Sequence, residues 1–185
     1  LAQHLGFKRF AVFGYSSGGP NAMACAVKLP SKVSACGLMS SDGPYKILGM
    51  VGRMFENATP TQEVSAKHAK SLHDTLAAGY RKLKPLRSEL ALSDLANSIC
   101  QGFDKGPSQD ALLECGDWDF HPSEVDGSKL PVLLWHGVAD HDVPVHVGQY
   151  LAESIPGVVA KFVEGESHSM VRRKWGEFLK LIVAV

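Results

Sequence analysis

The order of elements in residues 7–42 limits the fold of this chain more than any other feature. Phe10–Phe13 is a short continuous apolar run, typical of a strand buried on both faces of a sheet. A glycine-rich turn breaks the run, and the helix expected after it has Pro20 at a first helical position and ends at Pro30. Residues 33–40 predict a second strand. A strand, a helix and a strand in this order predict a right-handed parallel crossover.

The same alternation returns near the C-terminus. Residues 131–135 predict a buried strand, 145–154 a helix, and 158–163 a further strand. The last helix carries apolar side chains at helical spacing on one face: Trp175, Phe178, Leu179 and Ile182. These patterns predict an α/β fold in which helices cover both faces of a parallel sheet.

The middle of the chain differs because its pattern is helical. Thr59 and Pro60 are typical of a helix start, and further helices are predicted at about 86–100 and 107–114. We interpret this stretch as a lid inserted between two core segments. The predicted boundaries are 1–42 for the first core segment, 43–122 for the helical lid or cap, and 123–185 for the second core segment.

Charge and composition exclude several classes of protein. The 185 residues include 19 Lys and Arg and 19 Asp and Glu, so the net charge is zero and the electrostatic footprint of a nucleic-acid-binding protein is missing. No apolar run approaches the length of a membrane span. The four cysteines show no CxxC or zinc-ligand spacing, which favours a reduced, cytoplasmic protein, while a targeting signal ahead of Leu1 stays open.

The turn after the first strand contains the G-x-S-x-G pattern of a nucleophile elbow, Gly14-Tyr15-Ser16-Ser17-Gly18. We expect glycine at 14 and 18 because a side chain at either place would clash across the tight turn that exposes Ser16. Ser17 is the competing nucleophile, but Tyr15 rather than glycine stands two residues before it. With Ser16 as nucleophile, the backbone N–H of Ser17 is an expected oxyanion donor. The alternative is an ordinary turn with a serine helix cap.

An elbow serine needs a base and an orienting acid. Asp140 follows the strand at 131–135, and His168 follows the last strand, so both loops open on the sheet edge that carries Ser16. The order Ser, Asp, His is that of the nucleophile-elbow enzymes. Asp42, after the second strand, is the reserve acid. Taken singly, an aspartate in a loop is usually a turn former or helix cap, and most histidines are bystanders.

A metal site is the competing interpretation of the same loop, because five potential ligands crowd it: His136, Asp140, His141, Asp142 and His146. No metal-binding spacing such as HExxH is present. We therefore expect neither a metal nor another cofactor.

These motifs resemble the α/β-hydrolase superfamily and, within it, the lid-bearing group of small-molecule hydrolases and acyltransferases. The resemblance runs from Leu5 through the elbow to Val33, resumes at Trp118, and continues through Gly137, Val143-Pro144 and His168. It implies a partial α/β-hydrolase fold holding strands five to eight of the family order.

Two departures from the family stand out. Ser167 takes the place where such proteins usually have glycine before the histidine. The family's first four strands, which precede the elbow strand, have no counterpart. We therefore expect a C-terminal fragment in which the elbow strand is a sheet edge and the second oxyanion donor is missing, so that the fragment alone has reduced activity.

The expected function is a serine hydrolase acting on an ester-type bond of a small, apolar molecule through Ser16, His168 and Asp140. The expected partner is a small-molecule substrate, and the sequence leaves the oligomeric state open. Candidate pocket residues are Tyr15, Met50, Met54 and Phe55, although the apolar ones equally suit the core of the lid. The alternatives are a receptor-like ligand-binding protein on the same fold and a metal-dependent hydrolase.

Overall fold

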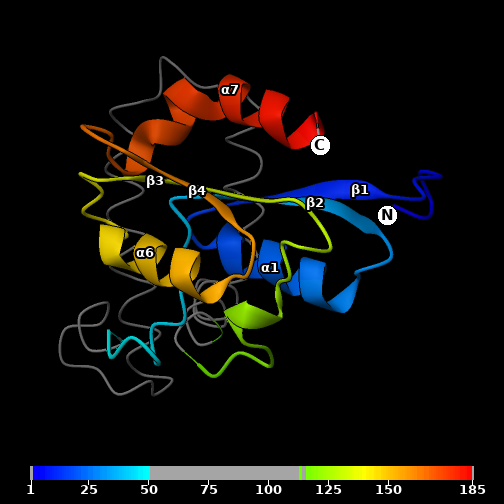
Figure 1. Ribbon diagram of the computed structural model, residues 1–185, viewed down its shortest axis with the longest axis horizontal. Helices are drawn as coiled ribbons and strands as arrows, with labels where there is room; N and C mark the ends of the chain where they lie inside the picture. The colour runs from blue at the N-terminus through cyan, green and yellow to red at the C-terminus, as the bar shows by residue number, and fades with distance from the viewer. Residues whose placement is uncertain (1, 51–112, 114–115, 185) are drawn as a thin grey trace, which may run out of the picture. The chain divides into compact units, whose positions relative to one another are not determined.

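Four parallel strands form one sheet in the computed structural model, which describes residues 2–50, 113 and 116–184 (Figure 1). Each strand pairs in parallel with its neighbour in the chain, in the order β1-β2-β3-β4. The strands are β1 (Phe10–Tyr15), β2 (Val33–Met39), β3 (Val132–Gly137) and β4 (Val159–Val163). Their carboxyl ends therefore lie at one edge of the sheet, where the loops that follow them gather.

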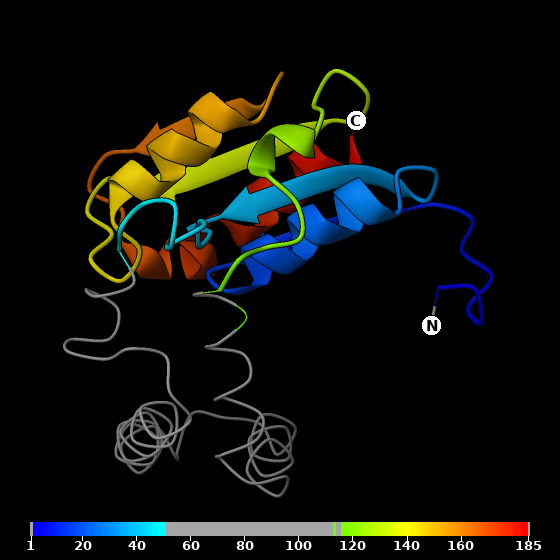
Figure 2. The same ribbon diagram turned by 90° about the horizontal axis from the view of Figure 1, so that it is seen from below.

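Helices cover both faces of this sheet. Figures 1 and 2 show α1 (Gly18–Lys28) and α6 (Val145–Ser154) on one face and α7 (Val171–Val183) on the other. Two short 3₁₀ helices, η2 (Pro122–Glu124) and η3 (His168–Met170), complete the described elements. The predicted α/β class with a helix-covered parallel sheet is confirmed.

Alternation along β2 produces the two layers of the core. Leu38 packs with residues of α1 and α6 on one face, whereas Met39 packs with Phe178 and Ile182 of α7 on the other. Successive side chains of a strand point to opposite faces, so one buried strand supplies both clusters. A Cβ added to Gly37 would lie 2.6 Å from atoms of Phe178 and Ile182, so this glycine lets α7 approach the sheet closely.

The predicted strands and helices of the two core segments are present, with small shifts of their ends. Helix α1 begins at Gly18, two residues before Pro20. The prediction that Phe10–Phe13 is buried on both faces is wrong, because Ala11 is exposed and the other three residues are only half-buried. The reason is the place of β1 at the edge of the sheet, which was itself expected.

The chain divides into two compact units, one made of Leu1–Gly43 and Trp118–Val185 and the other of Pro44–Asp117. The helices predicted at 59, 86–100 and 107–114 fall almost entirely outside the described residues, so the lid stays a prediction. Within the described ranges, no helix is long and apolar enough to cross a membrane.

Candidate active site

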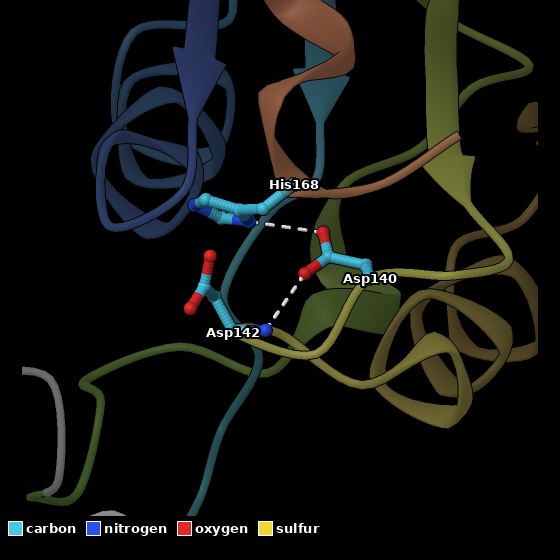
Figure 3. A group of neighbouring side chains, drawn as sticks. All are labelled: Asp140, Asp142 and His168. Carbon is cyan, nitrogen blue, oxygen red and sulfur yellow. Dashed lines mark hydrogen bonds and ion pairs between the residues drawn. The ribbon is translucent and has the colours of Figure 1, made fainter. Parts of the chain in front are cut away.

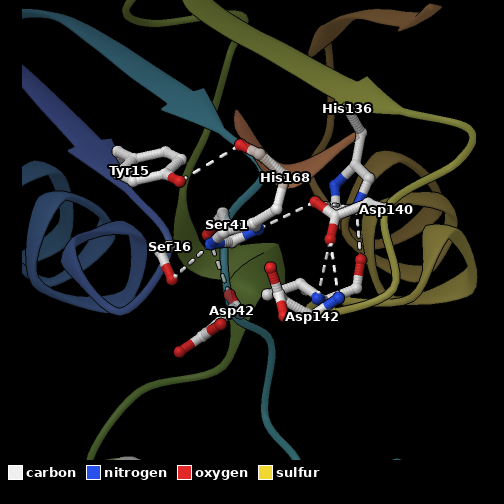
Figure 4. A network of polar contacts seen from close by, with 9 residues as sticks. Tyr15, Ser16, Ser41, Asp42, His136, Asp140, Asp142 and His168 are labelled. Atoms are coloured by element: carbon white, nitrogen blue, oxygen red, sulfur yellow. Dashed lines mark hydrogen bonds and ion pairs between the residues drawn. The ribbon is translucent and has the colours of Figure 1, made fainter. Parts of the chain in front are cut away.

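Three loops from separate strand ends bring the predicted triad residues together (Figure 4). Ser16 follows β1, Asp140 follows β3, and His168 follows β4. The Ser16 hydroxyl lies 3.1 Å from His168 Nε2, and His168 Nδ1 lies 2.9 Å from Asp140 Oδ2. Because a carboxylate accepts, Nδ1 carries the proton and Nε2 is left to accept from Ser16 Oγ. The arrangement is a continuous hydrogen-bond relay from hydroxyl to carboxylate.

Backbone geometry exposes Ser16 on the turn. Its φ is 54°, in the left-handed region that residues with a Cβ seldom occupy outside strained functional turns. A Cβ at Gly14 would lie 2.3 Å from the carbonyl oxygen of Gly18, so glycine is required at position 14.

The expected steric need for glycine at 18 is not present, since a Cβ there would meet nothing within 4 Å. The second crowded position is Gly19, where a Cβ would lie 1.7 Å from Ser41 Oγ. The turn is therefore pressed against the end of β2 by the residue after the motif rather than by the last residue of the motif.

The end of β2 also holds the elbow backbone. The amide of Asp42 donates to the Ser16 carbonyl at 3.0 Å, and the amide of Ser16 donates to the Met39 carbonyl at 3.2 Å. Asp42, the reserve acid, is buried beside the elbow, but His168 Nδ1 bonds to Asp140. The structure thus gives the position of the orienting acid to Asp140.

Backbone amides orient the Asp140 carboxylate. Oδ1 accepts from the amides of Asp142 at 3.0 Å and Val143 at 2.9 Å, which leaves Oδ2 for His168. Burial by itself raises the pKa of Asp140, but the bonds from His168 and Val143 and the charge of His168 outweigh it and hold the pKa below its ordinary value. Asp140 is therefore ionised at neutral pH.

His168 is held from two sides. Burial disfavours its cation, but the hydrogen bond and charge of Asp140, with the charges of Asp142 and Asp42, raise its pKa above the ordinary value. On the other side, the Tyr15 hydroxyl donates to the His168 carbonyl at 3.1 Å, and the two rings lie 4.9 Å apart. Tyr15, predicted as a pocket residue, is thus a direct neighbour of the imidazole.

The sequence matches no protein-family model and no curated protein. Among solved structures, the meta-cleavage product hydrolase CumD of Pseudomonas fluorescens shares 18% identity at a TM-score of 0.59, over 99% of this chain and 66% of its own. The hydrolase BphD of a Rhodococcus strain, named for 2-hydroxy-6-oxo-6-phenylhexa-2,4-dienoate, shares 15% identity at a TM-score of 0.59. The match covers 100% of this chain and 66% of BphD. Est816, an N-acyl homoserine lactone degrading enzyme, shares 22% identity at a TM-score of 0.59, and the match covers 99% of this chain and 70% of Est816. The chain has the α/β-hydrolase fold.

The chain spans about two thirds of the length of the α/β-hydrolases CumD and BphD. Nearly all of this chain takes part in each match, so the resemblance predicted from the elbow and the acid loop is confirmed for the fold. The matched proteins are hydrolases with different named substrates, and at these identities the likeness concerns the fold and leaves the substrate undecided.

The remaining predicted site residues are the oxyanion donor Ser17 and the apolar pocket candidates. Ser17 is the N-cap of α1 and makes no side-chain cap bond. At such a position the backbone N–H has no acceptor within the helix. Of the apolar pocket candidates, Met50 is buried and belongs to the unit Pro44–Asp117, whereas Met54 and Phe55 lie outside the described residues.

One group in the described ranges has the composition of a metal site, namely Asp140, Asp142 and His168, whose nearest nitrogen and oxygen atoms lie within 4.8 Å of one another (Figure 3). Of the predicted metal candidates, His136, His141 and His146 are not in this group. Both ring nitrogens of His168 already take part in the relay, so a metal would have to displace Asp140 or Ser16. We therefore assign Asp140 and His168 to the relay rather than to a metal.

Sequence reasoning missed Ser40 at the end of β2. This residue is fully buried with a φ of 45°, and its side chain helps to hold the pKa of Asp140 below its ordinary value. A serine in the left-handed region costs free energy and is typical of functional turns. No pattern in the sequence marks it, because it follows an ordinary apolar strand.

Proposed function

We propose that this site hydrolyses an ester-type bond of a small, apolar molecule, with Ser16 as nucleophile, His168 as general base and acid, and Asp140 as the orienting acid. The observation that carries the proposal is the relay, with 3.1 Å from Ser16 Oγ to His168 Nε2 and 2.9 Å from Nδ1 to Asp140 Oδ2. An accidental cluster would not be expected to join three loops in the order and tautomer that acyl transfer requires.

In the first half of the reaction, His168 Nε2 takes the proton of Ser16 Oγ as Oγ attacks the substrate carbonyl carbon. The carbonyl oxygen becomes an oxyanion, which the amide of Ser17, the N-cap residue of α1, stabilises in this proposal. When the intermediate collapses, the bond to the leaving oxygen breaks and that oxygen takes the proton from His168. The product is an alcohol and an acyl-serine.

In the second half, water gives a proton to His168 Nε2 and attacks the acyl carbon. Collapse of this intermediate breaks the bond to Ser16 Oγ, which takes the proton back, and the carboxylic acid leaves. Asp140 keeps the Nδ1 proton in place throughout and stabilises the imidazolium that forms twice. The raised pKa of His168 makes it the stronger base for both steps.

A serine nucleophile with this base also suits thioesters, lactones, amides and activated carbon–carbon bonds. The matched structures include a meta-cleavage product hydrolase, a 2-hydroxy-6-oxo-6-phenylhexa-2,4-dienoate hydrolase and a lactone-degrading enzyme, so they favour no single class. An ester is the first substrate to test because its cleavage demands the least of the oxyanion site.

The test combines fluorophosphonate labelling, peptide mass mapping of the adduct, and turnover of short-chain and medium-chain p-nitrophenyl esters. The expected result is an adduct on Ser16 and turnover that the Ser16→Ala variant loses by a factor of about 10³ or more. Ser31→Ala, which alters an exposed serine, is the matched control. Absence of both adduct and turnover would contradict the proposal.

The two other functions have their own outcomes. Saturable binding of an ester that is never turned over would favour a ligand-binding protein. Turnover that a chelator abolishes would favour a metal-dependent hydrolase at Asp140, Asp142 and His168, the group described above. A serine hydrolase predicts turnover unchanged by chelation.

A further inference from the structure

A second histidine lies behind the acid of the relay. His136, near the end of β3, is fully buried, and its Nε2 lies 2.9 Å from the carbonyl oxygen of Val143. Since a carbonyl oxygen only accepts, Nε2 carries the proton and Nδ1 bears the lone pair. The tautomer of His136 is therefore opposite to that of His168.

The bond from His136 closes a ring of contacts around the turn that carries Asp140. Asp140 Oδ1 accepts the amide of Val143 at 2.9 Å, while the carbonyl of the same residue accepts from His136. Both backbone groups of Val143 are thus held, one by the acid and one by strand β3. His136 Nε2 is 3.8 Å from Asp140 Oδ2, too far for a hydrogen bond, so its influence on the carboxylate passes through the turn.

Helix α6 packs closely against the imidazole ring of His136. A Cβ on Gly148 would lie 2.5 Å from His136 Nδ1, so only glycine allows the helix to lie this close to the ring. In the described part of the chain, Nδ1 has no hydrogen-bond partner. Burial holds the pKa of His136 below its ordinary value, despite the bond to Val143 and the charge of Asp140, so the ring stays neutral.

We propose that His136 is a positioning residue which, through Val143, holds the Asp140 carboxylate in line with His168. The proposal rests on the serine hydrolase function proposed above. It assigns to His136 no contact with substrate and no proton transfer. Gly148 contributes to the same arrangement because the absence of a side chain there leaves space for the imidazole ring of His136.

The test compares three variants at positions 136 and 148. His136→Phe keeps a planar side chain but removes the donor, His136→Gln offers an amide N–H in its place, and Gly148→Ala leaves every donor but displaces the ring. His141→Gln, at an exposed histidine of the same turn, is the control. Circular dichroism establishes that each variant folds, and the two readouts are compared only among folded variants.

Two readouts separate positioning from a purely structural role. The first is the NMR titration of the His168 Cε1 proton, which needs no turnover, and the second is the rate of fluorophosphonate labelling. We expect His136→Phe and Gly148→Ala to move the His168 titration to lower pH and to slow labelling about tenfold, the effect of one lost buried hydrogen bond. His136→Gln should recover most of both.

An unchanged His168 titration and labelling rate in either folded variant would overturn the proposal, and so would equal losses in His136→Phe and His136→Gln. If the starting protein does not label at all, the proposed hydrolase function fails, but the His168 titrations of the four variants still decide the role of His136. The two failures are thus distinguishable.

Discussion

The turn that carries Ser16 and the turn that carries Asp140, here the acid turn, are built by different means. Around Ser16 the decisive contacts are steric: an added Cβ would overlap the backbone of Gly18 at position 14 and the side chain of Ser41 at position 19. Around Asp140 the decisive contacts are hydrogen bonds, from two amides and from His168, with His136 holding the turn from behind. The Ser16 turn therefore depends on close packing, and the Asp140 turn depends on hydrogen bonds.

This difference separates stability from chemistry. A steric fault at Gly14 has no relief, because the atoms that would collide are backbone atoms, so it costs folding free energy as well as activity. A substitution that removes a hydrogen bond from the acid turn leaves the packing in place and changes the charge or the direction of the Asp140 carboxylate. Variants in the two regions should accordingly differ in whether stability or catalysis responds first.

The largest expected effect is at Gly14. Gly14→Ala should lower the free energy of unfolding by about 3 kcal/mol, because its Cβ would lie 2.3 Å from the Gly18 carbonyl oxygen. Gly18→Ala, whose Cβ meets nothing within 4 Å, is the matched variant and should stay within about 0.5 kcal/mol of the starting protein. Urea unfolding measures both, and equal losses would remove the steric distinction.

Asp140→Asn is next and should act on catalysis before stability. The amide no longer stabilises the imidazolium or fixes the Nδ1 proton, so kcat should fall by a factor of about 10⁴. Asp42→Asn is the comparison at the reserve acid, where the loss should be less than about tenfold because His168 Nδ1 bonds to Asp140 and Asp42 acts on His168 through its charge. Ester kinetics at several pH values provide the measurement, and a greater loss at Asp42 would reverse the assignment.

Tyr15→Phe joins the two regions, because Tyr15 is the last residue before the nucleophile and donates to the His168 carbonyl. The variant keeps the ring against the imidazole and loses one partly buried hydrogen bond, so labelling of Ser16 should slow about fivefold. An unchanged rate would show that the histidine loop is held without this bond.

The smallest expected effect is electrostatic. The charge of Asp142 helps to raise the pKa of His168, so Asp142→Asn should lower that pKa. The neutral imidazole is the active base, and kcat/KM rises as pH passes upward through its pKa; the acid limb of the pH profile should therefore move to lower pH. High salt should reduce the shift because Asp142 is exposed. A shift to higher pH would contradict the assigned sign.

The order of strands, the elbow and the chain order of Ser16, Asp140 and His168 were predictable because each depends on local patterns. An apolar run, a glycine-rich turn and a following helix restrict the backbone wherever they occur. The need for glycine at 18 was predicted wrongly, since the crowded neighbour of the turn is Ser41, at the end of another strand. No spacing within the motif could show which residue that strand would press against.

What the sequence by itself determined is therefore the fold class and the identity of the three relay residues. Only the tertiary structure decided that Asp140 bonds to His168 Nδ1, that the Tyr15 hydroxyl donates to the His168 carbonyl, and that His136 Nε2 donates to the Val143 carbonyl. The physical reason is the distance along the chain over which each kind of interaction acts. Backbone propensities act over a few neighbouring residues, whereas a hydrogen bond between loops 28 or 153 residues apart depends on where the whole sheet places its strand ends.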